Sequence, residues 1–248
     1  MNIAVIGYGR FGKEIERQAV RLGHTVPVLF TSHYPVVRHL QEHTGRIDCC
    51  IDVSVPAAVL SNVRTCADAG IPVVLGTTGW QQYHTELLET VRDRNGTLIY
   101  GSNFSVGAHI LFALVRAAAA MADHLPEYDV SVSEVHHRLK TDSPSGTALT
   151  IAREILSHMS RKSAIHHPDT GPIRPHELSI SSSRIGTVPG THSVLFHSAA
   201  DEIELVHRAH DRSGFAAGAV RAAELTAEIT GIHRFDDLVR ERFLHLPS

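Results

Sequence analysis

The sequence predicts an α/β protein with a doubly wound parallel sheet at the N-terminus and a central α+β domain that carries a mixed sheet. Short apolar segments alternate with helical periodicities through the first hundred residues. A Gly-x-Gly-x-x-Gly sequence directly follows the first apolar segment. Beyond residue 102 the alternation gives way to period-two patterns separated by short Gly and Asp turns, which favour an antiparallel or mixed sheet.

The N-terminal elements alternate between strand and helix with short connections. Strands are expected at residues 3–7, 26–30, 49–53, 72–75 and 97–100, the second weakened by Pro27. A first helix is expected where Phe11, Ile15, Ala19 and Leu22 recur at helical spacing, and Gly23 ends it. Further helices are expected at 57–69 and 83–94. Alternation of this kind is typical of a parallel sheet with helices on both faces.

The later elements predict a second domain and a return to the first. Helices are expected at 106–122 and 148–159, and strands at 128–138, 179–186, 192–198 and 202–210. An Ala-rich helix at 215–230 is expected to pack back on the N-terminal domain. We therefore predict an N-terminal domain of residues 1–104 and 213–248, and a central α+β domain of residues 105–212.

Composition limits the classes of function. Of 248 residues 43% are hydrophobic and 20% charged, and the net charge of −3 gives no sign of a nucleic-acid or membrane partner. The N-terminus is expected to be a core strand, not a signal peptide. Cys49, Cys50 and Cys66 have no metal or redox spacing and suggest buried thiols in a reducing cytoplasm. Nineteen histidines are present, but the nearest candidates for a metal site, 166–167 and 207–210, are weak, and we predict none.

The glycine loop indicates a dinucleotide site. Gly7 permits the tight turn, Gly9 lets the backbone approach a pyrophosphate, and Gly12 lets helix and strand pack closely. A plain tight turn is the alternative, but the strand before it and the helix after it favour a Rossmann-type fold with the helix N-terminus facing phosphates.

The end of the second strand bears on the choice of cofactor. Thr31, Ser32 and His33 stand where an NAD-preferring site usually has an acid, and the first carboxylate after them is Glu42. Thr31, Ser32, His33 or Arg38 could donate to a 2′-phosphate. We expect NADPH or NADH, with NADP(H) or dual use favoured.

Two polar turns follow successive strands. Residues 76–79 read Gly-Thr-Thr-Gly, and residues 101–104 read Gly-Ser-Asn-Phe. Ligands of parallel sheets bind beyond the carboxyl ends of strands, so both turns are expected near the glycine loop. Either one alone would fit an ordinary polar turn equally well.

The stretch 136–148, HHRLKTDSPSGTA, combines polar groups with a helix start. Ser145 is a predicted N-cap, and the free N–H groups beside Gly146 and Thr147 would suit a carboxylate. His136 and Lys140 suit proton transfer and charge stabilisation, but in a straight strand they would lie about 13 Å apart. They can share a site only if the strand ends at or just after His137; a solvated polar loop remains the alternative.

That stretch, with Glu134 before it, resembles the signature of the dihydrodipicolinate reductase family, also called 4-hydroxy-tetrahydrodipicolinate reductases. The resemblance continues through residues 5–12, 76–79, 103–107, 184–186 and 204–219, in the family's order, and so covers nearly the whole chain.

The resemblance implies NADPH- or NADH-dependent reduction of a small cyclic dicarboxylate in diaminopimelate and lysine biosynthesis, by a homotetramer joined through its central sheets. It implies that residues 1–104 and 213–248 form a dinucleotide-binding domain, and that residues 105–212 form a substrate-binding and oligomerisation domain. It implies that His136 and Lys140 are proton donors, and that His137, Ser145, Gly146 and Thr147 hold the substrate carboxylates. It also implies a cofactor site lined by Gly7, Tyr8, Gly9, Arg10, Phe11, Gly12, Thr31, Gly76, Thr77, Thr78, Gly101, Ser102, Asn103 and Phe104.

The sequence departs from the family at two places. No acid followed by a basic residue stands at the end of the second strand, which leaves cofactor preference open. Thr191 precedes His192 where the family usually has Glu, and we expect altered local packing or interface contacts without lost activity. The alternatives are another two-domain dehydrogenase, such as one acting on aspartate, and a non-catalytic nucleotide sensor.

Overall fold

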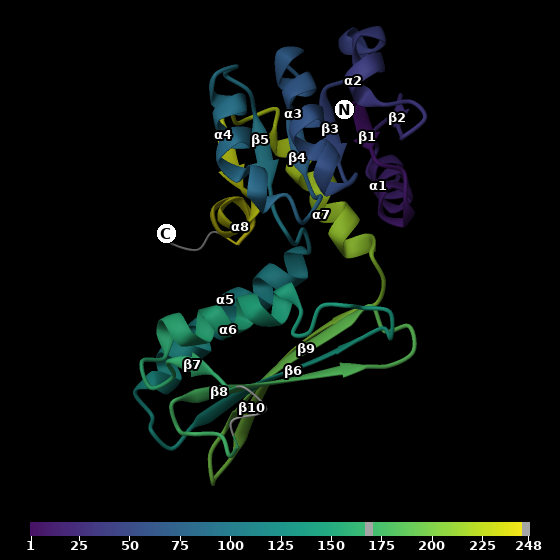
Figure 1. The fold of residues 1–248 in the computed structure, drawn as a ribbon. Coiled ribbons are helices and arrows are strands. Elements are labelled where there is room, and N and C mark those ends of the chain that lie inside the picture. Colours follow the sequence, from purple (N-terminus) through teal and green to yellow (C-terminus); the bar gives the residue numbers. More distant parts are fainter. Residues whose placement is uncertain (167–170, 245–248) are drawn as a thin grey trace. The chain divides into compact units, whose positions relative to one another are not determined.

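The computed structural model describes residues 1–166 and 171–244 and divides the chain into two compact units. One unit comprises Met1–Val106 and Arg212–Ser248, and the other comprises Gly107–Asp211 (Figure 1). His167, one residue of the weak metal-site candidate 166–167, lies outside the described residues.

The first unit is built on a six-stranded sheet in the order β11-β5-β4-β3-β1-β2, and every pair in it is parallel. Its strands are β1 (Ile3–Ile6), β2 (Leu29–Phe30), β3 (Cys49–Asp52), β4 (Val73–Leu75), β5 (Leu98–Tyr100) and β11 (Ile232–Arg234). Its helices are α1 (Arg10–Arg21), α2 (Val36–His39), α3 (Val59–Asp68), α4 (His84–Arg92), α7 (Ser213–Leu225) and α8 (Phe235–Leu238). The doubly wound fold predicted from the sequence is confirmed.

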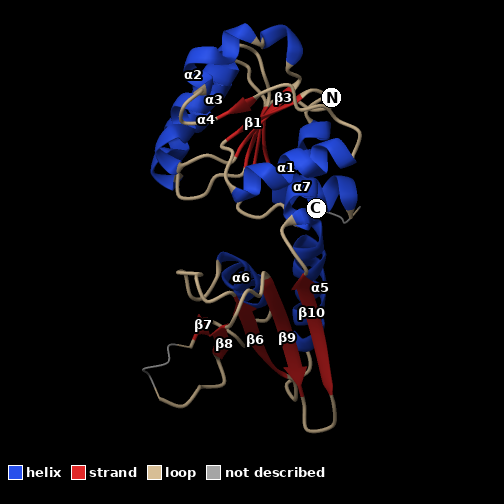
Figure 2. Ribbon diagram, turned by 90° about the vertical axis from the view of Figure 1, so that its right-hand side faces the viewer, coloured by secondary structure: helices blue, strands red, loops and turns tan. Residues whose placement is uncertain are grey.

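Alternate residues of each strand enter different cores. In β1, Ile3 and Val5 pack with α1 and α7, whereas Ala4 and Ile6 pack in the core that holds residues of α2, α3 and α4. Figure 2 shows these two helical layers on opposite faces of the sheet. A sheet covered on both faces has apolar strands without polar alternation, which is why these segments read as continuous apolar runs.

The second unit carries a five-stranded mixed sheet in the order β10-β9-β6-β8-β7. Its strands are β6 (Asp129–His136), β7 (Ala164–Ile165), β8 (Glu177–Arg184), β9 (Gly190–His197) and β10 (Glu202–Ala209). β6 runs parallel to β8 and antiparallel to β9. Helices α5 (Val106–Asp123) and α6 (Gly146–His158) pack on one face of this sheet (Figures 1 and 2).

Helix α5 is long and apolar enough to pass a length-and-composition test for a membrane span, although the sequence suggested no such segment. In the structure its Leu111, Phe112 and Val115 belong to the buried core of the second unit. A helix that serves as a core element needs the same apolar composition, so α5 is accounted for by packing.

Several predicted boundaries were wrong. β2 spans two residues instead of five, because Pro27 has no N–H to donate to the ladder. The last Ala-rich helix begins at Ser213 and ends at Leu225 instead of residue 230. The N–H groups of Thr226, Ala227 and Glu228 bond three residues back instead of four, so the α-helix ends in tighter turns. β7, α2, α8 and the sixth parallel strand β11 were not expected.

Candidate active site

The site in the second unit begins with the side-chain alternation of β6. Val130 and Val132 point into the core beneath α5 and α6. Alternation therefore places Glu134 and His136 on the same face, at the carboxyl end of the strand. Both are almost completely buried.

Glu134 is held by three donors on one carboxylate oxygen. Its Oε1 accepts hydrogen bonds from the Ser145 N–H at 3.0 Å, the Ser182 hydroxyl at 2.8 Å and Arg184 at 3.3 Å. Burial raises the pKa of Glu134, but the interactions with His192, Ser145 and Ser182 together outweigh it and hold that pKa far below its ordinary value. Glu134 is therefore a buried carboxylate ion.

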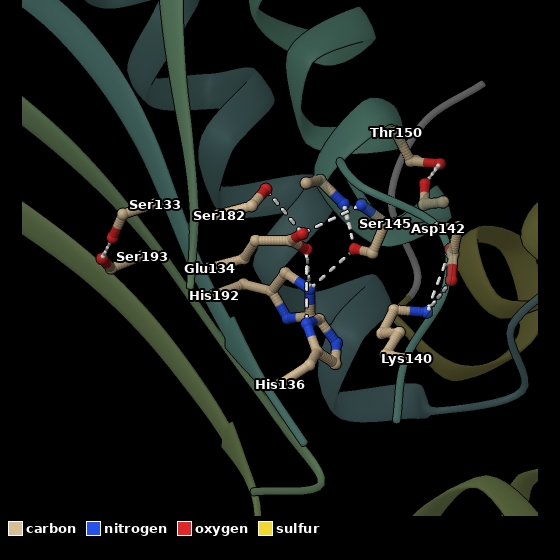
Figure 3. Close-up of polar contacts among 12 residues, drawn as sticks. Ser133, Glu134, His136, Lys140, Asp142, Ser145, Thr150, Ser182, His192 and Ser193 are labelled. Atoms are coloured by element: carbon tan, nitrogen blue, oxygen red, sulfur yellow. Dashed lines mark hydrogen bonds and ion pairs between the residues drawn. The ribbon is translucent and has the colours of Figure 1, made fainter. Parts of the chain in front are cut away.

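Two imidazoles face the other oxygen of Glu134 (Figure 3). His136 Nδ1 lies 3.4 Å from Oε2, and His192 Nε2 lies 3.5 Å from the same atom. His192 enters the site from β9, where it stands directly opposite Glu134 in the antiparallel register. The two rings are 5.0 Å apart and nearly perpendicular.

Burial, followed by the neighbouring charge of His192, lowers the pKa of His136 to about 4 although the Glu134 carboxylate acts in the opposite direction. The neutral imidazole is therefore the form of His136 in the free protein at neutral pH.

Glu134, His136 and His192 place three potential metal-ligand atoms within 4.8 Å of one another. The Glu134 carboxylate already pairs with Arg184 and accepts hydrogen bonds from N–H and O–H donors, so its charge is balanced without a metal ion. We interpret the three residues as a hydrogen-bonding cluster. The other candidate pair, His207 and His210, does not belong to such a group within residues 1–166 and 171–244.

The chain turns where β6 ends. The strand stops at His136, and the Lys140 N–H bonds to the His137 carbonyl at 3.1 Å, so the predicted break at or just after His137 is confirmed. The turn brings the Lys140 charge close enough to contribute to the lowered pKa of His136. Lys140 Nζ pairs with Asp142 at 2.7 Å, and Figure 3 shows this pair beside the cluster.

Helix α6 begins at the same place. The Ser145 hydroxyl accepts the Ala148 N–H at 3.1 Å, which confirms the predicted N-cap, and it also lies 3.3 Å from His192 Nε2. Gly146 has open space where a side chain would stand. The Gly146 backbone bonds the Asp142 carboxylate, which also pairs with Lys140, so the start of α6 and this lysine hold a carboxylate of the chain itself. A helix N-terminus beside a cationic lysine has the chemistry of a carboxylate site. His137 lies half-buried just after the strand end.

The first unit presents the glycine loop. Gly7 has a φ of +95°, and a Cβ there would lie 2.6 Å from the Val53 carbonyl oxygen. A Cβ on Gly12 would lie 2.0 Å from the Gly7 carbonyl oxygen, so only glycine lets α1 start this close to β1. The first turn of α1 contains no acidic residue. These features fit a dinucleotide pyrophosphate.

The remaining predicted cofactor residues differ in what their side chains do. Thr77 is buried and donates to Asp52, whereas Thr78 and Ser102 are exposed. The Thr31 hydroxyl accepts N–H groups of the following turn. Phe104 stacks on Phe235 in the core, so its ring serves packing. The others, Tyr8, Gly9, Arg10, Phe11, Gly76, Gly101 and Asn103, lie in the glycine loop, at the start of α1 or in the turns after β4 and β5.

Sequence reasoning missed three buried polar residues. Glu134 entered only as the first letter of a resemblance, and His192 only as the neighbour of Thr191. The alternation of β6 could have put Glu134 beside His136, but His192 needed the pairing of β6 with β9. Asp52, at the end of β3, connects two loops, and in the sequence it lay within the strand expected at residues 49–53.

Comparisons with known proteins identify the family. Residues 1–104 match the N-terminal domain of dihydrodipicolinate reductase, and residues 107–239 match its C-terminal domain. A 4-hydroxy-tetrahydrodipicolinate reductase of Christiangramia forsetii is 39% identical over 98% of this chain and 99% of its own. One of Natronomonas pharaonis is 36% identical, covering 96% of this chain and 100% of its own.

A solved structure shares the fold. The dipicolinate-bound dihydrodipicolinate reductase from Paenisporosarcina sp. TG-14 superimposes with a TM-score of 0.75 at 20% identity, covering 96% of this chain and 99% of the other. Both domain types, the full-length relatives and the fold lead to the same conclusion: the chain belongs to the dihydrodipicolinate reductase family.

Proposed function

We propose that the chain reduces 4-hydroxy-tetrahydrodipicolinate to tetrahydrodipicolinate in diaminopimelate and lysine biosynthesis, with NADPH or NADH as reductant and release of water. The family assignment carries the reaction. The observation that carries the chemistry is the buried Glu134, His136 and His192 cluster beside Lys140 and the start of α6.

The glycine loop and the start of α1 would hold the nicotinamide dinucleotide by its phosphates, since Gly7 and Gly12 leave no room for side chains there. When bound, the reduced nicotinamide supplies the hydride. The protein residues then have three tasks: to bind a dianion, to orient it and to supply a proton.

The start of α6 and Lys140 suit the first two tasks. Gly146 and Thr147 would contribute N–H groups of the first helical turn in exchange for the Asp142 carboxylate, which the Gly146 backbone bonds in the free protein, and Ser145 fixes that turn by capping it. His137 and Lys140 add positive or polar contacts for the carboxylates. Lys140 is held by Asp142 in the free protein, and a substrate carboxylate would compete for the same ammonium group.

His136 suits the third task once the substrate is bound. Its pKa of about 4 leaves it neutral in the free protein. The nearby charges of a dicarboxylate favour the imidazolium form, so substrate binding would raise the pKa of His136 towards neutrality. His136 would then donate the balancing proton, with Lys140 as a second donor.

We also propose a homotetramer joined through the sheets of the second unit, acting in the cytoplasm. The face of the sheet opposite α5 and α6 carries Ser133 and Ser193, hydrogen-bonded at 2.7 Å. Cys49, Cys50 and Cys66 are buried free thiols, as suits a reducing compartment. Light scattering on a sizing column tests the tetramer, and a monomer would refute it.

The direct test of the reaction uses substrate freshly made by the synthase that precedes this enzyme. Purified protein is mixed with it and with NADPH or NADH in parallel, and loss of the nicotinamide absorbance is followed. Oxidation of one or both cofactors that requires the substrate is expected. The ratio of the two kcat/KM values decides the cofactor preference, since Thr31 supplies no carboxylate against a 2′-phosphate. No oxidation of either would refute the proposal.

A further inference from the structure

Two buried polar atoms in the second unit face each other without a well-formed hydrogen bond. Glu134 Oε2 and His136 Nδ1 are 3.4 Å apart, and neither has a hydrogen-bond partner within the part of the chain that the structure describes; Oε2 also lies 3.5 Å from His192 Nε2. Leaving such a pair unmade in a buried place costs free energy, so its retention calls for a reason.

The carboxylate cannot easily turn away from the histidine. Its Oε1 is fixed by Ser145, Ser182 and Arg184, on α6 and β8. With Oε1 anchored, Oε2 points at His136 Nδ1, as Figure 3 shows. An ionised carboxylate oxygen can only accept, so the proton of a neutral His136 is stabilised on Nδ1.

The opposite edge of the His136 ring packs against a glycine. A Cβ on Gly190 would lie 3.1 Å from Nε2 and 3.3 Å from Cδ2. Any side chain there would press on this edge of the imidazole. Glycine at this position therefore leaves room for the ring edge that carries Nε2.

We propose that Glu134 is a positioning residue that holds His136 as the Nδ1–H tautomer and leaves Nε2 as the atom that takes up and delivers the proton. This rests on the proposed function, because it assumes that His136 is the proton donor. Beyond that function, Nε2 is assigned as the nitrogen that exchanges the proton, and Glu134 as the group that determines which nitrogen does so.

The variant Glu134→Gln tests the idea with almost no change in shape. The glutamine oxygen can still accept from Ser145 and Ser182, and its amide nitrogen then faces His136 Nδ1. An amide N–H donates, so Nδ1 must become the acceptor and the proton moves to Nε2. An Asp-to-Asn change beside the histidine of a serine protease, a known case of this inversion, lowers kcat by about 10⁴.

The decisive measurement is ¹⁵N NMR of the imidazole nitrogens in histidine-labelled protein at neutral pH. The signals of His136 are assigned by their loss in His136→Asn. Wild type is expected to show a protonated Nδ1 and an unprotonated Nε2, and Glu134→Gln the reverse. Ser182→Ala is the matched control, since it removes one donor to Oε1 and should keep the wild-type tautomer.

A wild-type protein with the proton on Nε2 would overturn the proposal even if the variant failed to fold. The same tautomer in wild type and in a folded Glu134→Gln would overturn it as well. Activity gives a second readout: kcat should fall about 100-fold or more, while KM for the nicotinamide cofactor stays unchanged. The NMR result needs no substrate, so failure of the proposed reaction and failure of this assignment remain distinguishable.

Discussion

Asp52 provides a prediction that depends on hydrogen bonds alone. Its completely buried carboxylate ends β3 and receives three side-chain or backbone donors. Oδ1 accepts from the Ser54 N–H at 2.9 Å and the Thr77 hydroxyl at 3.0 Å, and Oδ2 accepts from Asn62 at 3.0 Å. Asp52 thus connects the loop after β3 to the turn after β4, where the cofactor is proposed to bind.

Removing the Asp52 carboxylate should destabilise the protein far more than replacing it by an amide. Asp52→Ala removes an acceptor from three buried donors, each at about 1–3 kcal/mol. Thr77 keeps the Asp52 carbonyl oxygen at 3.3 Å and Asn62 keeps Ser54 Oγ at 3.2 Å, so we expect a loss towards the lower end of that sum, about 3–5 kcal/mol in the free energy of unfolding. Asp52→Asn keeps both Oδ1 interactions. A flip of the Asn62 amide restores the third, so a loss below about 1 kcal/mol is expected.

Urea denaturation of both variants, with Tm from calorimetry, measures the difference. For a chain of this length the alanine variant should melt about 10 °C lower than the asparagine variant.

The sign of the pH dependence is also fixed. Burial raises the pKa of Asp52 above 3.8, so the carboxyl's contribution to stability is complete below 3.8 and is lost as pH rises through the raised pKa. Asp52→Asn should therefore gain stability relative to wild type over that rise.

Equal destabilisation by the two Asp52 substitutions would refute the hydrogen-bond account. A matched control is the exchange Asp52→Asn with Asn62→Asp, which reverses donor and acceptor across the 3.0 Å contact. The exchange should keep KM for the cofactor within about threefold of wild type if the loops are held by hydrogen bonds and not by the position of the charge.

Three further predictions follow from the same structure. Ser145→Ala should cost about 1 kcal/mol in urea denaturation, because the Ala148 N–H loses its cap; an unchanged midpoint would contradict this. Gly12→Ala should weaken cofactor binding at least about tenfold by fluorescence titration, because a Cβ would lie 2.0 Å from the Gly7 carbonyl oxygen; unchanged affinity would count against the loop assignment. The pKa of His136 is lowered from 6.5 to about 4 in the folded state. Its contribution to the free energy of unfolding should therefore be complete above pH 6.5 and be lost, by about 3 kcal/mol, as the pH falls from 6.5 to 4. His136→Gln should abolish this part of the pH dependence of stability.

Local chemistry made part of this structure predictable. The spacing of Gly7, Gly9 and Gly12 after an apolar run has few other structural explanations, and the N-cap at Ser145 follows from side-chain chemistry within three residues. The end of β6 was predicted because His136 and Lys140 could not otherwise share a site.

Features that depend on distant pairing were not predictable. His192 reaches Glu134 only because β9 pairs with β6 in one particular register, and a shift by one residue would turn it to the opposite face. β11 has three residues, and its place in the sheet depends on pairing with β5 from a distant part of the chain. Asp52 gains its partners from two loops that come together only in the folded sheet.

The central claim is that His136 and Lys140 deliver the proton in a nicotinamide-dependent reduction of 4-hydroxy-tetrahydrodipicolinate. Steady-state rates with freshly made substrate and saturating NADPH or NADH should therefore be compared for wild type, His136→Gln and Lys140→Ala, with Ser61→Ala on the exposed surface of α3 as a control. We predict rapid oxidation by wild type and the control, and rates at least about 100-fold lower for the two site variants. An inactive wild type, or full activity in Lys140→Ala, would contradict the account.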